Sequence, residues 1–227
     1  MTRLALSLLA VAVLSMPPGA RGATWTEGTN YVRVAPPQQT TVASGKIEVM
    51  EVFSYGCPAC NVFQPVMEKL RHALPANAQI TYLPAAFNPQ EAWPMFQRAF
   101  LAAQALGIAD RSHQAMFDAV WKTGELGIIE PGSNRLKDPL PSIADAARFY
   151  ARVAGVNPQQ FLAMANSFSI DSKVRAADAQ IVAMHVDSTP TLIVNGKYRV
   201  IRDSLQTNDQ LIELVKYLVA RESGSPG

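Results

Sequence analysis

A buried strand that runs directly into a pair of cysteines at a helix start is the sequence feature that most constrains the fold. Residues 46–54 read KIEVMEVFS, a β-branched and apolar segment with little alternation. This pattern is typical of a strand buried on both faces of a sheet. Residues 55–60 read YGCPAC, and a helix is expected through residues 61–73 with Pro65 inside it. The segment therefore predicts a strand, a turn with two thiols and a helix in direct succession.

Cys57 is expected at the N-cap of this helix, with Pro58 at the first helical position and Ala59 after it. Proline fits there because the N–H that it lacks would be unpaired in the first turn. The first-turn amides and the helix dipole then point at the Cys57 sulfur and stabilise its thiolate. Cys60 lies one turn further in and is expected to be less exposed, with an ordinary or raised pKa. Cys57 is therefore the candidate attacking thiol, and Cys60 is the candidate resolving thiol.

Three other interpretations of the Cys57–Cys60 pair are a structural disulfide, half of a metal site and a coincidence. The chain has 2 cysteines, so neither a four-thiolate zinc site nor a disulfide framework can form, and no metal is expected. A disulfide across two residues closes almost no chain and stabilises a fold little. A redox-active disulfide is thus favoured, with no separate cofactor. An inert pair in a peptide-binding chaperone is the non-enzymatic alternative.

The segments after the cysteine helix predict one more strand and then a run of helices. Residues 24–44 are expected to form an irregular or edge-strand arm, and residues 79–84 read as the next strand. From Asn88 the apolar residues follow a helical period, and residues 88–91 resemble a capping box with proline at the first helical position. Further helices are expected near 112–122, near 142–153, after Asn157 and over 170–184.

A hairpin and a helix end the chain. Residues 191–201 contain Asn195-Gly196, a strong signal for a two-residue hairpin turn, and a last helix opens at Thr207. The predicted order is β-α-β, five helices and then β-β-α. This order corresponds to an α/β sheet domain of residues 24–87 plus 171–227, interrupted by a helical insertion at 88–170.

Thr189-Pro190 immediately precedes the strand at 191–194. About 5–6% of X–Pro bonds in folded proteins are cis, so local statistics favour a trans bond here. A proline that opens a strand beside the cysteine helix removes one N–H near the disulfide and leaves the Thr189 backbone free to pair with an extended substrate. Thr189 and Pro190 are therefore candidate substrate-binding residues.

Glu51 is the candidate acid–base group. It lies in the predicted buried strand, six residues before Cys57, with apolar neighbours on both sides. Burial raises the pKa of a carboxyl, and a carboxyl beneath the thiols can exchange a proton with Cys60. A solvated edge position is the alternative, and it is expected for Glu48. The histidines are scattered in the sequence and are expected to be core or surface residues: His72, His113 and His185.

Residues 1–23 have the pattern of a secretory signal, with a basic start, an apolar run and small residues before cleavage after Gly22 or Ala23. The formal net charge of the chain is +2, and both excess positive charges, on Arg3 and Arg21, lie in this segment. Residues 24–227 therefore carry no net charge, which gives no electrostatic case for binding nucleic acid or an anionic membrane. The mature protein is expected to be exported and soluble.

The arrangement resembles the thioredoxin superfamily, through the CPxC helix start, Pro65 and the downstream Thr189-Pro190. The helical insertion, Glu51 and residues 190–198 (PTLIVNGKY) are similar to DsbA-type thiol:disulfide oxidases. This resemblance implies a thioredoxin fold with an inserted all-helical domain and a cis Thr189–Pro190 bond beside the disulfide. It also implies oxidation of unfolded exported protein thiols in the periplasm, and reoxidation by a quinone-coupled membrane partner of the DsbB type.

The sequence departs from this family at two positions. Ala59 stands where many relatives carry a histidine that helps to hold the thiolate, and residues 79–84 lack the lysine that often pairs with the buried glutamate. We therefore expect Cys57 to be acidic, but less so than in such relatives, and the protein to be a milder oxidant. A less oxidising redox potential would also suit a disulfide isomerase or reductase of the same fold, which is therefore the alternative function. The single CxxC without a dimerisation module favours an oxidase, expected to act as a monomer.

Overall fold

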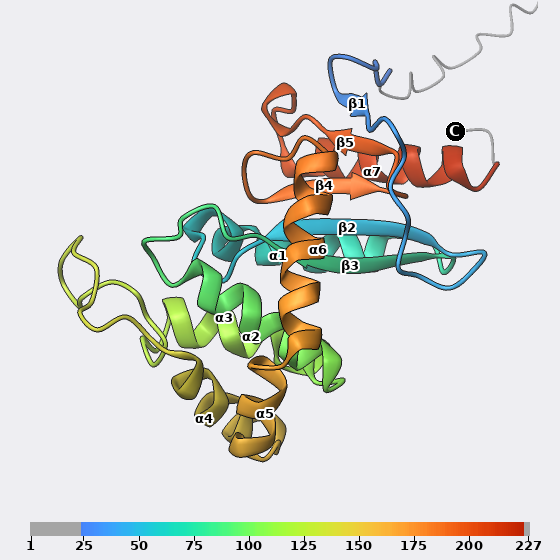
Figure 1. Cartoon of the computed structure of the whole chain (residues 1–227). Coiled ribbons are helices and arrows are strands. Elements are labelled where there is room, and N and C mark those ends of the chain that lie inside the picture. The colour runs from blue at the N-terminus through green and yellow to red at the C-terminus, as the bar shows by residue number, and fades with distance from the viewer. Residues whose placement is uncertain (1–23, 225–227) are drawn as a thin grey trace, which may run out of the picture.

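The computed structural model describes residues 24–224, which fold around a 5-stranded mixed sheet (Figure 1). The strands are β1 (Tyr31–Arg33), β2 (Ile47–Phe53), β3 (Ala78–Pro84), β4 (Thr191–Val194) and β5 (Tyr198–Val200). Their order across the sheet is β1-β5-β4-β2-β3. β2 pairs in parallel with β3 and antiparallel with β4, and every residue of β2 is buried. The sheet is therefore built around the strand that leads to the cysteines.

The order of elements along the chain is the predicted one, preceded by the edge strand β1. The predicted secretory segment, residues 1–23, lies outside the described residues. No helix within residues 24–224 is long and apolar enough to cross a membrane. The helices are α1 (Pro58–Ala73), α2 (Trp93–Ala105), α3 (Ala109–Trp121), α4 (Ile143–Ala154), α5 (Pro158–Ala165), α6 (Phe168–Ala183) and α7 (Asn208–Glu222).

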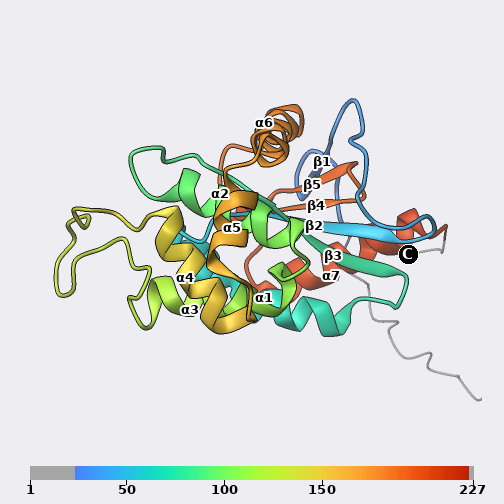
Figure 2. The ribbon, with the colours of Figure 1, turned by 60° about the horizontal axis from the view of Figure 1, so that its bottom comes forward.

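Helices cover both faces of the sheet, with α6 on one side and α1 and α7 on the other (Figure 2). On the first face, Met50 and Ile193 pack with the C-terminal half of α6. On the opposite face, Val49 and Leu192 pack with α1 and α7. Successive residues of a strand point to opposite faces, so β2 must be apolar throughout. This explains the lack of alternation in its sequence.

Helices α2 to α5 surround a second core beside the sheet. The same core takes in Phe53, Tyr55 and both cysteines. α6 begins in this core with Ile170, and its C-terminal half then covers the sheet. The turn that carries the two thiols therefore lies at the junction between the helical layer and the sheet. The largest buried side chains contributed by the helical layer are aromatic: Phe96, Phe100, Phe117, Phe149, Tyr150 and Phe161.

The predicted hairpin between β4 and β5 is confirmed. Asn195 and Gly196 have φ values of 52° and 64°, in the left-handed region that a primed two-residue turn requires. A Cβ on Gly196 would lie 2.1 Å from the backbone oxygen of Gln38. Gln38 N–H in turn donates to the Gly196 carbonyl at 2.9 Å. The turn therefore needs glycine for its backbone conformation and for the close approach of the N-terminal arm.

The expected capping box at residues 88–91 is wrong. These residues lead through a turn, and α2 begins later, at Trp93, after an Ala92 that makes no side-chain cap. The Glu91 carboxylate accepts a hydrogen bond from the Trp93 indole N–H at 2.9 Å. Because this carboxylate is occupied by a side chain that is itself buried in the helical core, it does not cap a helix at 88–91.

The expected solvated position of Glu48 is also wrong. This side chain is fully buried, and Oε1 accepts hydrogen bonds from Thr41 N–H at 3.0 Å and from the Thr41 hydroxyl at 2.7 Å. The N-terminal arm crosses this end of the sheet, because Gln38 bonds to Gly196 and Thr41 bonds to Glu48. The arm supplies the polar partners that make burial of the carboxylate tolerable.

We predict that Gly196→Ala lowers the free energy of unfolding by more than about 2 kcal/mol, because it adds a backbone clash to the cost of a left-handed residue. Gly45 is a matched control, since its φ is 82° and a Cβ there meets nothing within 4 Å. Gly45→Ala should cost only about 1 kcal/mol. Denaturant unfolding of both variants measures the difference, and equal losses would show that the contact with Gln38 is unimportant.

Candidate active site

The Cys57 sulfur caps the first turn of α1. Cys57 has φ −87° and ψ 116°, and its Sγ accepts a hydrogen bond from Cys60 N–H at 3.4 Å. Pro58 occupies the first turn, as the sequence predicts, and the side chains of Pro58 and Ala59 are exposed. Both cysteines are free thiols in this structure. The N-cap position predicted for Cys57 is therefore confirmed.

The pKa of the Cys57 thiol is lowered from its ordinary value of 9.0 to about 6. The hydrogen bond from the Cys60 thiol is the largest cause, and Thr189 and the first-turn amides add to it. Burial opposes these effects, since Cys57 is only 5% exposed. In the reduced protein, Cys57 is therefore mostly a thiolate at neutral pH.

Cys60 has the opposite character. Its side chain is fully buried, and burial raises the pKa of its thiol well above the ordinary value, with the hydrogen bond to Cys57 as the next cause. The Gln64 side chain donates to the Cys60 carbonyl at 3.3 Å, one turn further along α1. The two thiols thus differ in acidity in the direction that their positions in the helix predict.

The peptide bond between Thr189 and Pro190 is cis. Local statistics favour trans at this bond, whereas the family resemblance implies cis, and the structure agrees with the resemblance. The Cys57 thiol lies 3.5 Å from the carbonyl oxygen of Thr189, a residue 132 positions away in the sequence. Thr189, Pro190 and Cys57 are therefore brought together by the fold.

Glu51 lies fully buried in β2. Neither of its carboxyl oxygens has a hydrogen-bond partner among residues 24–224. Burial, and secondarily the charge of Cys57, raise the pKa of this carboxyl from 4.5 to about 8. Its parallel neighbour in β3 is Tyr82, so an aromatic hydroxyl residue stands opposite the glutamate. The predicted burial and raised pKa of Glu51 are confirmed.

Three side chains of the helical layer hold the turn before Cys57. The Trp121 indole donates to the Tyr55 carbonyl at 2.8 Å, and the Tyr55 hydroxyl lies 2.9 Å from His113 Nδ1. A Cβ on Gly56 would lie 2.8 Å from the Trp93 ring, so this contact needs glycine. Sequence reasoning did not assign these side chains to the site, because apolar and aromatic residues at helical spacing look like ordinary core.

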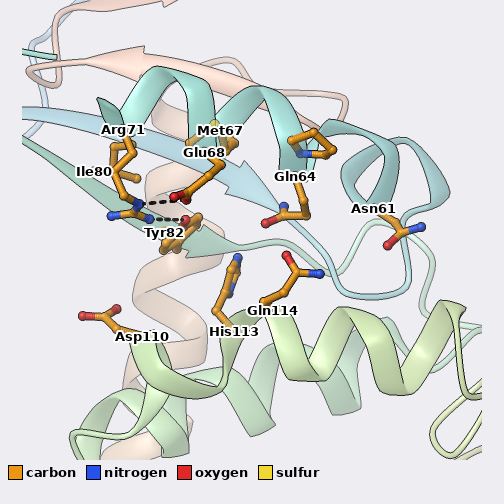
Figure 3. Close-up of a pocket in the computed structure, with 11 residues that line it drawn as sticks. Asn61, Gln64, Met67, Glu68, Arg71, Ile80, Tyr82, Asp110, His113 and Gln114 are labelled. Atoms are coloured by element: carbon orange, nitrogen blue, oxygen red, sulfur yellow. Dashed lines mark hydrogen bonds and ion pairs between the residues drawn. The ribbon is translucent and has the colours of Figure 1, made fainter. Parts of the chain in front are cut away.

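A groove of about 720 Å³ opens between α1, β3 and α3 (Figure 3). On its walls, the Arg71 guanidinium donates to the Tyr82 hydroxyl at 3.0 Å. Its Nε lies 3.5 Å from Oε2 of Glu68. His113 projects from α3 toward Tyr82, and the two ring centroids are 4.1 Å apart. The groove therefore reaches Tyr82, the residue beside Glu51 in the sheet.

No group of three or more potential metal-ligating side chains occurs within the described part of the chain. A family model described as Thioredoxin matches residues 43–216. With a pair of thiols of unequal acidity at the start of α1, the fold defines a thioredoxin-like thiol:disulfide oxidoreductase.

The curated relatives narrow this class. The chain is 31% identical over 220 residues to the thiol:disulfide interchange protein DsbA of Pseudomonas aeruginosa, covering 95% of this chain and 96% of that protein. It is 33% identical over 216 residues to DsbA of Pseudomonas syringae pv. tomato, covering 92% and 90%. The chain belongs to the DsbA family of thiol:disulfide interchange proteins.

Solved structures give the same result. DsbA of Xylella fastidiosa matches with a TM-score of 0.73 and 33% identity, covering 87% of this chain and 97% of that one. DsbA of Pseudomonas aeruginosa matches with a TM-score of 0.71 and 32% identity, covering 88% and 95%. The expected thioredoxin fold with an inserted helical domain is therefore confirmed.

We predict that Glu51→Gln changes the pH dependence of stability of the reduced protein. Because the folded-state pKa of Glu51 is raised from 4.5 to about 8, the wild-type protein loses stability as the pH rises through this window. The cost is on the order of 1.4 kcal/mol for each unit of pKa shift. The variant should therefore gain stability relative to wild type between pH 4.5 and pH 8, as measured by denaturant unfolding at several pH values.

Glu48→Gln is the matched control, since Glu48 is equally buried in the same strand but accepts two hydrogen bonds from Thr41. A gain confined to Glu51→Gln would assign the pH dependence to the Glu51 carboxyl rather than to the loss of any buried carboxyl from β2. If Glu51→Gln and wild type lost stability in parallel over this window, the carboxyl of Glu51 would not titrate as described.

Proposed function

We propose that the Cys57–Cys60 disulfide is donated to exported proteins as they fold. A substrate thiolate attacks the Cys57 sulfur, the Cys57–Cys60 bond breaks, and the Cys60 sulfur leaves. A second substrate thiolate then attacks the substrate sulfur of this mixed disulfide and releases Cys57 as a thiolate. The substrate loses two electrons and gains a disulfide, and the protein gains the reduced dithiol.

The unequal acidity of the two thiols is the observation that carries this proposal. A thiolate with a pKa of about 6 stabilises the reduced protein at pH 7 by roughly 1.4 kcal/mol, or about 30 mV for a two-electron couple. Release of Cys57 from the mixed disulfide is thereby favoured. Stabilising the reduced protein makes its disulfide an oxidant. The modest size of this stabilisation supports the milder oxidant expected from Ala59.

We assign the proton of Cys60 to Glu51. The pKa of Cys60 is raised, so this sulfur needs a proton when it leaves and must lose one when it attacks. A buried carboxyl with a pKa of about 8 is protonated in part near neutral pH and can serve in both directions. Glu51 lies beneath α1 in the strand that ends at the thiols.

The Thr189 backbone is the proposed docking edge for the substrate. Its carbonyl faces the Cys57 sulfur at 3.5 Å, and Pro190 has no N–H to compete for a partner. We further propose that the sheet domain comprises residues 24–87 and 171–227 and that residues 88–170 form the insertion. On this division, the insertion supplies Trp93, His113 and Trp121, which hold the turn of the sheet domain.

The family membership supports further assignments. We place the protein in the periplasm as a monomer, after removal of residues 1–23, with unfolded exported proteins as its substrates. A DsbB-type quinone-coupled membrane protein would reoxidise the dithiol, and the disulfide itself is the redox group, without another cofactor. A disulfide isomerase or reductase is the second candidate, because the exposed Ala59 side chain adds no donor to the Cys57 thiolate beyond the backbone amide.

We predict that the redox potential separates these functions. Equilibration of the purified protein with glutathione buffers, followed by quantification of the oxidised fraction, gives its value. Ala59→His should make the protein more oxidising by about 30 mV for each unit by which it lowers the pKa of Cys57 below neutral pH. Ala59→Asn is a neutral control and should change the potential less. Equal potentials for Ala59→His and wild type would contradict the assigned role of this position.

We also predict that Cys60→Ala traps a mixed disulfide with a cysteine-containing peptide, because the attacking sulfur of Cys57 remains while the resolving thiol is lost. The peptide is supplied as an activated disulfide, whose leaving thiol Cys57 expels, and mass spectrometry detects the adduct. Cys57→Ala should form little adduct at pH 6, since the pKa of Cys60 is raised. Faster labelling of Cys60 than of Cys57 would reverse the assigned roles.

A further inference from the structure

Three of the buried polar atoms without a hydrogen-bond partner among residues 24–224 belong to residues that flank Tyr82: both carboxyl oxygens of Glu51 and Nε2 of His113. The Tyr150 hydroxyl, in the helical core, is another such atom. Glu51 is fully buried, and His113 is only 6% exposed. Because nearly all buried polar groups are hydrogen-bonded to protein or to ordered water, these three atoms require an explanation.

The packing places His113 against the neighbours of Glu51. Glu51 and Phe53 share one face of β2, and Tyr82 stands beside Glu51 in the parallel register of β3. The His113 ring centroid is 4.1 Å from that of Tyr82 and 5.0 Å from that of Phe53. His113 therefore packs against two residues that flank Glu51, and it lines the groove together with Tyr82 (Figure 3).

The other ring nitrogen of His113 is already engaged. Nδ1 lies 2.9 Å from the Tyr55 hydroxyl. Burial lowers the pKa of His113 to about 3, so the imidazole is neutral at physiological pH and carries one N–H. We assign the donor role in this contact to the Tyr55 hydroxyl, which places the ring proton on Nε2. Nε2 is therefore a buried donor, and the unpartnered Glu51 oxygens are buried acceptors.

We propose that His113 is a positioning residue for Glu51: one buried water accepts a hydrogen bond from Nε2–H of His113 and donates to the Glu51 carboxylate. Such a water would satisfy all three atoms, as buried waters commonly do. This proposal rests on the proposed role of Glu51 as the proton partner of Cys60. By donating to the ionised form, His113 favours the state of Glu51 that can take a proton from Cys60.

None of the other titratable groups around Glu51, the Cys60 thiol included, makes a hydrogen bond to its carboxyl oxygens in the structure. Cys57 is negative in the reduced protein, and Arg71 on α1 already donates to Tyr82 and lies beside Glu68. Asp110 of α3 lines the groove and is an acceptor when ionised. The surrounding hydroxyls have raised pKa values and stay neutral: Tyr55, Tyr82 and Tyr150.

Three substitutions of His113 separate the contributions of the two ring nitrogens. His113→Phe removes both. His113→Gln keeps a side-chain amide N–H at about the distance of Nε2 from the backbone, whereas His113→Asn reaches only as far as Nδ1. The carboxyl pKa of Glu51 is measured in the reduced full chain by carbon NMR of labelled glutamate, with Glu51→Gln to assign the signal. The second readout is the rate at which Cys60 expels glutathione from a Cys57–glutathione disulfide.

We expect His113→Phe and His113→Asn to raise the pKa of Glu51 by about one unit and to slow Cys60 attack at pH 7 several-fold, since a hydrogen bond to a charged group is lost. His113→Gln should keep both values near wild type. If His113→Phe does not fold, the Gln and Asn pair decides. A purely structural role would lower stability in all three variants and leave the pKa of Glu51 unchanged, which would overturn the proposal.

The experiments test the role of Glu51 and the role of His113 separately. If Glu51→Gln slows Cys60 attack but no His113 variant shifts the pKa of Glu51, the proposed role of Glu51 stands and that of His113 is wrong. If Glu51→Gln leaves Cys60 attack unchanged, the proton-transfer role of Glu51 is wrong, and the positioning role of His113 falls with it.

Discussion

The chemistry of this protein depends on a sulfur atom that takes the place of an N-cap oxygen. The Cys57 Sγ accepts the first-turn N–H of Cys60, so the same geometry that begins α1 also stabilises the thiolate. A helix normally uses Ser, Thr, Asp or Asn at this position. Here the capping group is also the reactive group, and forming the disulfide changes the group that caps the helix.

This cap needs support from outside the sheet domain. The Trp121 indole holds the backbone before Cys57 by donating to the Tyr55 carbonyl. The Trp93 ring lies so close to Gly56 that a side chain at position 56 would clash with it. The helical layer is therefore part of the active site in a physical sense. Beneath the cap, Cys60 and Glu51 are both buried, so each carries charge at a high energetic cost. The proposed transfer of one proton between Cys60 and Glu51 avoids a charge on both groups at once.

Local sequence signals predicted the parts of the fold that depend on local physics. The buried β2 strand, the N-cap cysteine and the Asn195-Gly196 turn each follow from a few adjacent residues. The burial of Glu48 was not predicted. Thr41, which covers it, belongs to an arm whose path no local sequence pattern indicates. Tertiary contacts also decided the start of α2, where Glu91 binds the Trp93 indole. His113 lies 58 residues from Tyr55, and a lone histidine on a helix gives no sign of such a partner.

Helix α6 joins the two layers without a break, since Ile170 packs in the helical core and Ile181 packs on the sheet. A continuous helix resists bending, whereas the other connection, residues 85–92, has no regular secondary structure. Relative movement of the two layers would therefore pivot about α6 and be taken up in that loop. Trp93 follows that loop directly and lies against Gly56, so a displacement of the loop would also loosen the turn that leads to Cys57.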